Sequence, residues 1–238
     1  MVAPNATLAV STVIFALRPT DDPGAESRAR SLWIPLVRRL RNPFDNFWAL
    51  PGGPLPAELD LRDAAAKTVE AVLGFAPRYL EQLYAFGDVD RSGTSGERVV
   101  SIVYWALVGD AEARRARLGQ NVRWLRADRL PTLAFDHNAI VDYALWRLRN
   151  KVEYAPLAQA FIDEPFTITQ LREVHEAVLG RRLDPANFRR QLAAAGGLVD
   201  TGEHLAGTPH RPPRLYRFDP AAHRIDQGPL AGPGRSPS

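Results

Sequence analysis

The sequence contains no cysteine, and lysine occurs at only two positions, Lys67 and Lys151. Without cysteine, disulfide bonds and thiolate metal sites are excluded. The absence also fits a reducing compartment, so we expect a cytoplasmic protein. No apolar run approaches the ~20 residues that a membrane-spanning helix needs, so we expect no membrane partner. The first residues lack the basic start of a signal peptide, and their alternation favours a strand.

The remaining composition is that of a globular protein. Hydrophobic residues make up 45% and charged residues 24% of the chain, which are ordinary values. A length of 238 residues exceeds one small domain and allows two. The net charge is only +3, but nearly all the basic residues are arginine. Arginine suits phosphate and guanine recognition, although many of these side chains must simply be solvated.

Apolar patterns predict a mixed first domain over residues 1–152. Residues 61–73 carry apolar side chains at helical spacing, with Asp60 as N-cap and Gly74 where a helix ends. A long amphipathic helix is predicted over roughly residues 136–151. Strands are predicted over residues 7–17, 31–39, 79–91 and 98–109.

After residue 152 three helical patterns are followed by two short β-type runs. Helix, helix, helix and hairpin is the order of a winged helix-turn-helix, which we assign to residues 153–222. Residues 223–238 are rich in Pro, Gly and Ser, and we expect them to be disordered. Candidate N-caps of the second and third helices are Thr167, Thr169 and Asp184.

The stretch LPGGPLPAELDLRDAAAKTVEAVLGF, residues 50–75, has the frame of a metal-dependent catalytic motif without its acids. A strand, a glycine turn and a helix with clustered acids would hold divalent ions against a pyrophosphate. Here the positions between Asp63 and Glu70 include Ala66 and Lys67. Spaced carboxylates of this kind are typical of a solvated helix face. We therefore predict no metal site and no catalytic residue.

Three residues are candidates for binding a small ligand. Gly52 and Gly53 would allow a ligand close to the backbone, and the alternative is a tight strand-to-helix turn that binds nothing. Arg98 is a candidate for a ligand phosphate, and a solvated arginine is the alternative. His137 invites a catalytic interpretation, but we expect it to cap or pack near the start of the long helix. Core positions, rather than stacking on a base, are expected for Trp33, Trp48, Phe86 and Trp105.

The C-terminal half offers side chains suited to DNA. Arginine pairs with guanine, and Asn or Gln with adenine, in the major groove. Arginine beside proline suits phosphates or a narrow minor groove. Residues 180–217 contain seven arginines and three acidic residues, so this segment carries a net positive charge that suits DNA. The alternative is a charged surface that contacts nothing. The predicted DNA-contacting residues are Thr167, Thr169, Gln170, Asn187, Arg189, Arg190, His210, Arg211 and Arg214.

Residues 50–75 resemble the Nudix box in glycines, apolar positions and spacing. The matching residues are Gly53, Val69, Gly74 and Phe75. The residues that stand where the box has glutamates are Leu59, Thr68, Ala71 and Val72, and Lys67 stands where it has arginine. The resemblance implies an α+β fold, with a Nudix-like α/β/α sandwich that does not hydrolyse its ligand.

Residues 7–219 as a whole resemble the Nudix-related transcriptional regulators, the NrtR family. The likeness is carried by FDNFWALPGG, LEQLYAFGDVDR, RVVSIVYWALV, LAFDHNAIVDYALWRLRNKVEY, FTITQLREVHEAVLGRRLDPANFRRQL and RPPRLYRF. The resemblance implies a homodimeric repressor of NAD biosynthesis genes, without enzyme activity or cofactor, on a palindromic operator of double-stranded DNA. It also implies that the Nudix-like domain binds ADP-ribose or a related nucleotide as effector.

Two other interpretations stay open. The first is an active Nudix hydrolase of ADP-ribose-type substrates with an accessory DNA-binding domain. The second is a repressor that has lost nucleotide sensing and responds to another signal.

Overall fold

The computed structural model describes residues 6–24, 29–89, 91, 98–116, 118–154, 156–206 and 212–221. Its strands are β1 (Ala6–Pro19), β2 (Arg30–Arg38), β3 (Trp48–Ala49), β4 (Gly52–Pro54), β5 (Tyr79–Phe86), β6 (Arg98–Val108), β7 (Val122–Arg126), β8 (Leu198–His204) and β9 (Arg214–Phe218). Its helices are α1 (Leu61–Leu73), α2 (Asp110–Arg115), α3 (His137–Tyr154), the 3-10 helix η2 (Pro156–Ala160), α4 (Ile168–Leu179) and α5 (Pro185–Ala195). None of the helices in these ranges is long and apolar enough to cross a membrane.

The first seven strands form one sheet with the order β3-β2-β1-β6-β5, to which β4 adds on β1 and β7 on β2. The long central pair, β1 and β6, is parallel, with Ala6 opposite Arg98 and Ala16 opposite Val108. The other pairs are antiparallel. Because helices cover both faces of the sheet, β1 is a nearly continuous apolar run.

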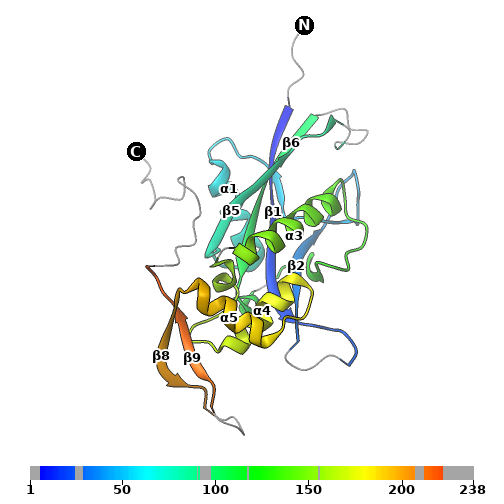
Figure 1. Ribbon diagram of the computed structural model, residues 1–238. Helices are drawn as coiled ribbons and strands as arrows, with labels where there is room; N and C mark the ends of the chain where they lie inside the picture. The colour runs from blue at the N-terminus through cyan, green and yellow to red at the C-terminus, as the bar shows by residue number, and fades with distance from the viewer. Residues whose placement is uncertain are drawn as a thin grey trace.

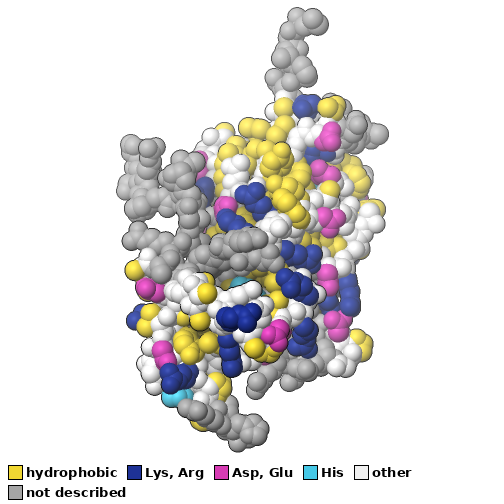
Figure 2. Space-filling view, in the orientation of Figure 1, with side chains coloured by type: hydrophobic (Ala, Val, Ile, Leu, Met, Phe, Trp, Pro, Cys, Tyr) yellow, Lys and Arg dark blue, Asp and Glu magenta, His cyan; other side chains and the backbone are white. Residues whose placement is uncertain are grey.

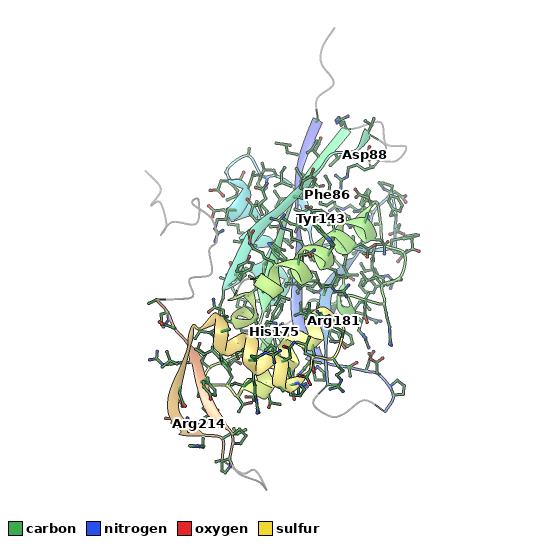
Figure 3. The ribbon with its side chains drawn as sticks, viewed as in Figure 1. Phe86, Asp88, Tyr143, His175, Arg181 and Arg214 are labelled. Carbon is green, nitrogen blue, oxygen red and sulfur yellow. The ribbon has the colours of Figure 1, made fainter. Side chains whose placement is uncertain are left out.

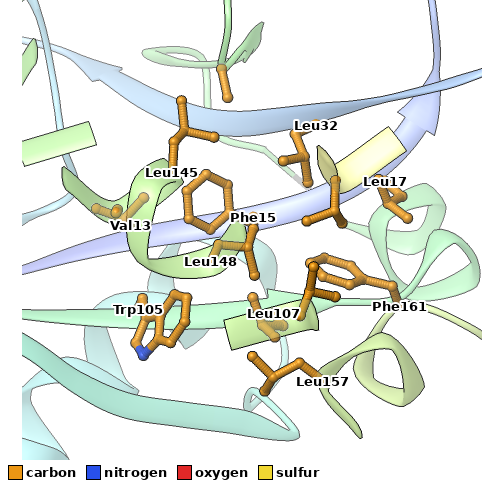
Figure 4. Packing of buried hydrophobic residues seen from close by; sticks show 14 of the residues in the cluster. Val13, Phe15, Leu17, Leu32, Trp105, Leu107, Leu145, Leu148, Leu157 and Phe161 are labelled. Carbon is orange, nitrogen blue, oxygen red and sulfur yellow. The ribbon is translucent and has the colours of Figure 1, made fainter. Parts of the chain in front are cut away.

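Successive residues of β1 supply two different cores, since strand side chains alternate between faces. Ile14 and Ala16 pack with buried residues of α1. Val13, Phe15 and Leu17 pack on the opposite face, where α3 crosses the sheet (Figure 1). Figure 4 shows this second core, and its labelled members come from β1, β2, β6, α3, η2 and Phe161.

Helix α1 begins and ends as the sequence predicts. The Asp60 side chain accepts a hydrogen bond from Asp63 N at 2.7 Å. Gly74 has a φ of +84° and its N–H donates to Glu70 O at 2.7 Å, which is a left-handed C-cap. The glycine pair before the helix differs from the turn that we considered. Gly52 and Gly53 form β4 and pair with Ser11 and Val10 of β1.

The C-terminal half has the predicted order of three helices and a hairpin. Figure 1 shows the β8–β9 hairpin projecting from the end of the molecule where α4 and α5 lie. Phe166 ties the hairpin to α4, because it exchanges backbone hydrogen bonds of 2.9 and 2.7 Å with Tyr216. The apolar core continues from the sheet through Phe161 to Phe188 and Phe218. The two halves therefore pack on one another. The boundary after residue 152 stays a prediction, and residues 223–238 lie outside the described ranges.

Candidate effector groove and DNA-binding surface

A groove of about 440 Å³ lies between β4 and α1, and we call it the α1 groove. Its lining comes from Val10 on β1, from β4 and the loop after it, and from one face of α1. The residues that line it are Val10, Gly52, Gly53, Pro54, Pro56, Glu58, Leu59, Ala64, Lys67, Thr68 and Ala71. The structure thus brings together Gly52 and Gly53 with several positions at which the Nudix box carries glutamates.

The charged side chains in this lining are Glu58 and Lys67. Lys67 is exposed, and no acidic residue of the described ranges forms an ion pair with it. Thr68 Oγ1 donates to Ala64 O at 2.8 Å, so its proton is already engaged. Over the described ranges, three or more His, Asp or Glu never gather as a metal site would require. A divalent ion takes several oxygen ligands, so the single carboxylate of Glu58 does not fit one.

The two glycines of the groove differ in what a side chain would meet. A Cβ on Gly52 would lie 2.4 Å from Val10 O, so Gly52 allows β4 to approach β1. A Cβ on Gly53, which also lines the groove, would meet no atom within 4 Å. Arg98 does not line the groove. It is exposed at the start of β6 and donates to Gly87 O at 3.1 Å, and its contact with a ligand stays a prediction.

His137 connects the loop before the groove to the first turn of α3. Its Nδ1 accepts a hydrogen bond from Leu50 N at 3.0 Å, and the side chain is buried. Burial lowers the pKa of His137 to about 4, so the ring is neutral at pH 7. The expectation that His137 packs near the start of the long helix is confirmed.

Two arginine clusters that sequence reasoning missed hold loops of the first domain in place. Arg126 binds Asp22 at 2.7 Å and Asp128 at 2.7 Å, and its hydrogen bond holds the pKa of Asp22 at about 2. Arg91 binds both carboxylate oxygens of Asp136 at 2.9 Å. No local signal marks Arg126 with Asp22 or Arg91 with Asp136, because these partners lie 104 and 45 residues apart in the chain.

Helix α5 has the features that we predicted for a recognition helix. Asp184 caps it by accepting a hydrogen bond from Asn187 N at 2.7 Å. Phe188 is its buried anchor, with its ring 5.2 Å from that of His175 on α4. Arg189 and Arg190 are exposed, and Arg190 donates to Asn187 Oδ1 at 2.6 Å. Contacts of these three polar residues with DNA stay predictions.

The start of α4 uses two of the predicted contact residues as a cap. Thr167 Oγ1 accepts from Gln170 N at 3.2 Å, and Gln170 Oε1 accepts from Thr167 N at 2.7 Å. The N-cap is therefore Thr167 and not Thr169, which is exposed. Thr167 is only 4% exposed, and its hydroxyl stabilises the first turn of α4.

The hairpin carries Arg214, which Figure 3 places apart from His175 and Arg181 of the α4 region. Its guanidinium pairs with Asp200 Oδ2 at 2.7 Å across the two strands. The backbone N–H of Gly202 and this arginine together lower the pKa of Asp200. His210 and Arg211 lie outside the described residues.

The turn between α4 and α5 depends on a carboxylate that sequence reasoning missed. Glu176 is 9% exposed, and its Oε1 accepts from Arg172 at 2.6 Å and from Leu183 N at 2.8 Å. Arg182 approaches its other oxygen at 3.7 Å. The four-residue spacing of Arg172 and Glu176 was a readable signal for part of this cluster.

A polar cavity of about 390 Å³ lies where the two halves meet, and we call it the junction cavity. Residues of β2, the end of β7, α3 and α4 line it. Arg149 of α3 donates to Val178 O of α4 at 3.3 Å beside it. Figure 2 shows Lys and Arg side chains gathered over α4 and beside β2. A side chain of α3 therefore contacts the last turn of α4 at this junction.

Comparison with known proteins defines the class. The model of the NrtR DNA-binding winged helix domain matches residues 159–218. Crystal structures of Shewanella oneidensis NrtR superpose with a TM-score of 0.74 (30% identity, 91% of this chain and 95% of that chain) and, complexed with a 27mer DNA, of 0.72 (28% identity, 90% and 94%). The fold is thus a Nudix-like α+β domain followed by a winged helix domain, as predicted.

Two proteins are similar to this chain in amino-acid sequence. The ADPR responsive transcriptional repressor NtrR of Acinetobacter baylyi is 32% identical over 193 residues, which are 79% of this chain and 76% of that protein. The ADP-ribose pyrophosphatase of Methanocaldococcus jannaschii is 30% identical over 115 residues, 48% of this chain and 67% of that protein. The chain belongs to the NrtR family of transcriptional repressors.

Proposed function

We propose that this chain is an ADP-ribose-responsive repressor of NAD biosynthesis genes whose Nudix-like domain does not hydrolyse its ligand. Two relatives support it, since one is an ADPR responsive transcriptional repressor and the other was crystallised in complex with a 27mer DNA. The α1 groove supports the loss of hydrolysis, because Leu59, Thr68 and Ala71 line it where the resemblance places glutamates.

The proposal depends most on how α5 is held in the fold with its polar side chains at the surface. Its cap at Asp184 and its anchor at Phe188 fix the helix, and Arg189 stays exposed on its surface. A fixed helix with a free arginine suits guanine recognition in a major groove. We assign the sensing part to residues 1–152 and the DNA-binding part to residues 153–222.

A palindromic operator is read by two copies related by a two-fold axis, so the proposal includes a homodimer. ADP-ribose must then bind more tightly to a conformation that fits the operator poorly. Two hydrogen bonds support such an effect. Leu50, two residues before Gly52, donates to His137 at the start of α3, and Arg149 of α3 donates to Val178 O of α4.

The test is titration of labelled NAD-gene promoter fragments with the purified chain, with and without ADP-ribose. We expect specific binding that weakens steeply with salt, and release when ADP-ribose is added. Equal affinity for promoter and random DNA would contradict the repressor assignment. Specific binding that no nucleotide alters would favour the repressor without nucleotide sensing.

A second candidate function is hydrolysis of ADP-ribose. The match to the Methanocaldococcus jannaschii pyrophosphatase supports it. Incubation of the chain with ADP-ribose and Mg²⁺ or Mn²⁺, followed by chromatography of the products, separates the candidates. We expect no turnover above the rate of a matched blank, and turnover that disappears with a chelator would establish the hydrolase.

A further inference from the structure

We propose that the α1 groove binds a pyrophosphate-type anion directly on Lys67, without a divalent metal ion. This inference rests on the proposed function in one respect, namely that the natural effector is a nucleotide carrying a pyrophosphate. It adds that Lys67 balances the negative charge of the anion, and it predicts that the effector binds without a divalent metal ion.

Lys67 lies in the middle of α1 and lines the groove, and no acidic residue of the described ranges pairs with it. The other lysine of the chain, Lys151, is engaged with Glu81 at 2.5 Å. An ammonium group without a protein counter-ion is a ready donor for phosphate oxygens.

The wall opposite α1 includes Gly53, where a Cβ would meet no atom within 4 Å. A ligand can therefore approach the backbone of β4 there without meeting a side chain. Small or apolar side chains, Leu59, Ala64 and Ala71, line much of the rest. None of these repels an anion, and none supplies a ligand for a cation.

The groove lining fits a metal ion poorly. Its carboxylate is that of Glu58, and one carboxylate cannot supply the oxygen ligands that Mg²⁺ requires. Glu58 also opposes an anion, so its charge weakens binding. Neutralising Lys67 and neutralising Glu58 should therefore change the affinity for the anion in opposite directions.

Calorimetric titration with ADP-ribose and with inorganic pyrophosphate tests it, in EDTA and in Mg²⁺. The variants are Lys67→Met, Glu58→Gln and, as the control, Glu70→Gln, whose exposed carboxylate lies on α1 outside the groove lining. We expect ADP-ribose to bind in EDTA with a Kd within about twofold of that in Mg²⁺. Lys67→Met should weaken it about tenfold and Glu58→Gln should tighten it about two- to fivefold. Glu70→Gln should leave it unchanged.

The outcomes separate this inference from the proposed function. Pyrophosphate binding in EDTA that depends on Lys67, with no binding of ADP-ribose, would support the groove and reject the proposed effector. ADP-ribose binding that requires Mg²⁺, or that survives Lys67→Met unchanged, would overturn the inference while leaving the effector assignment intact. Failure of both ligands to bind would overturn both.

Discussion

The backbone N–H of Leu50 donates to Nδ1 of His137 across 3.0 Å. Because Nδ1 accepts this bond, the neutral ring carries its proton on Nε2. Leu50 lies two residues before Gly52 of the α1 groove, and His137 is the first residue of α3. One buried hydrogen bond therefore joins the segment that leads into the α1 groove to the helix that contacts α4.

Replacing His137 by Phe keeps a ring in place and removes the acceptor. The buried N–H of Leu50 then lacks its partner, which costs about 1–3 kcal/mol of the free energy of unfolding. Urea unfolding followed by tryptophan fluorescence measures this loss. An unchanged midpoint would mean that the bond contributes nothing, and Phe135→Leu beside it serves as a control for packing alone.

Acid should destabilise the fold through two buried histidines. Burial lowers the pKa of both His137 and His175 to about 4, below the ordinary 6.5. The unfolded chain then takes up protons at a pH at which the folded chain does not, so stability falls as pH drops from about 7 and levels off below about 4. Between pH 7.5 and 5 we expect a loss of roughly 2 kcal/mol per histidine. Urea midpoints at both pH values measure it, and His175→Phe should remove about half of the difference.

The two glycines of β4 should respond differently to alanine. Gly52→Ala places a Cβ 2.4 Å from Val10 O, so β4 must move off β1, at a cost of about 2 kcal/mol or more. Gly53→Ala meets open space and should leave the melting temperature unchanged. Because Gly53 lines the α1 groove, the added methyl group should weaken ADP-ribose binding. Thermal melts and calorimetry on the pair check both statements, and equal melting temperatures would contradict the first.

Glu176 should control DNA affinity without contacting DNA. Glu176→Ala frees Leu183 N and Arg172, which loosens the turn before α5 and costs about 1–3 kcal/mol. Promoter affinity should fall, although removing an acid from a DNA-binding domain ordinarily raises affinity. Glu203→Ala, an exposed acid of β8, is the matched control and should leave affinity equal or higher. Fluorescence anisotropy distinguishes the two directions.

Arg189 is the side chain of α5 that we expect to read a base. Arg189→Ala should weaken specific binding by about 1–3 kcal/mol and relax the preference at one operator position. Arg38→Ala removes the same charge from β2 and should change specific affinity little. Competition with operators mutated one base pair at a time measures the effect. Uniform weakening on all sequences would assign Arg189 to phosphate contact instead.

Much of the architecture was predictable because it depends on local patterns. The caps at Asp60 and Gly74 of α1, the N-cap Asp184 of α5 and the helix–hairpin order are all encoded within a few residues. Local hydrogen bonds and apolar periodicity need no distant partner, so sequence alone reveals them. The sequence also predicted that Gly52 and Gly53 lie near the face of α1 that lacks acidic residues, because the two glycines closely precede α1 in the chain.

Other features depend on residues that meet only in the folded chain. The bond of Leu50 to His137 spans 87 residues, and that of Arg126 to Asp22 spans 104. The reciprocal hydrogen bonds between Thr167 and Gln170 are local. Only the burial of Thr167 in the folded chain shows that its hydroxyl caps α4 and does not face a partner at the surface.

The sequence by itself determined which elements form and which carboxylates are missing from α1, since both follow from residue identity and spacing along a helix. Only the tertiary structure decided that Lys67 stands without an acidic partner among the described residues, that a Cβ at Gly53 meets open space, and that α3 contacts α4. The physical reason is that charge pairing, free volume and packing depend on distances between segments, which the order of residues does not specify.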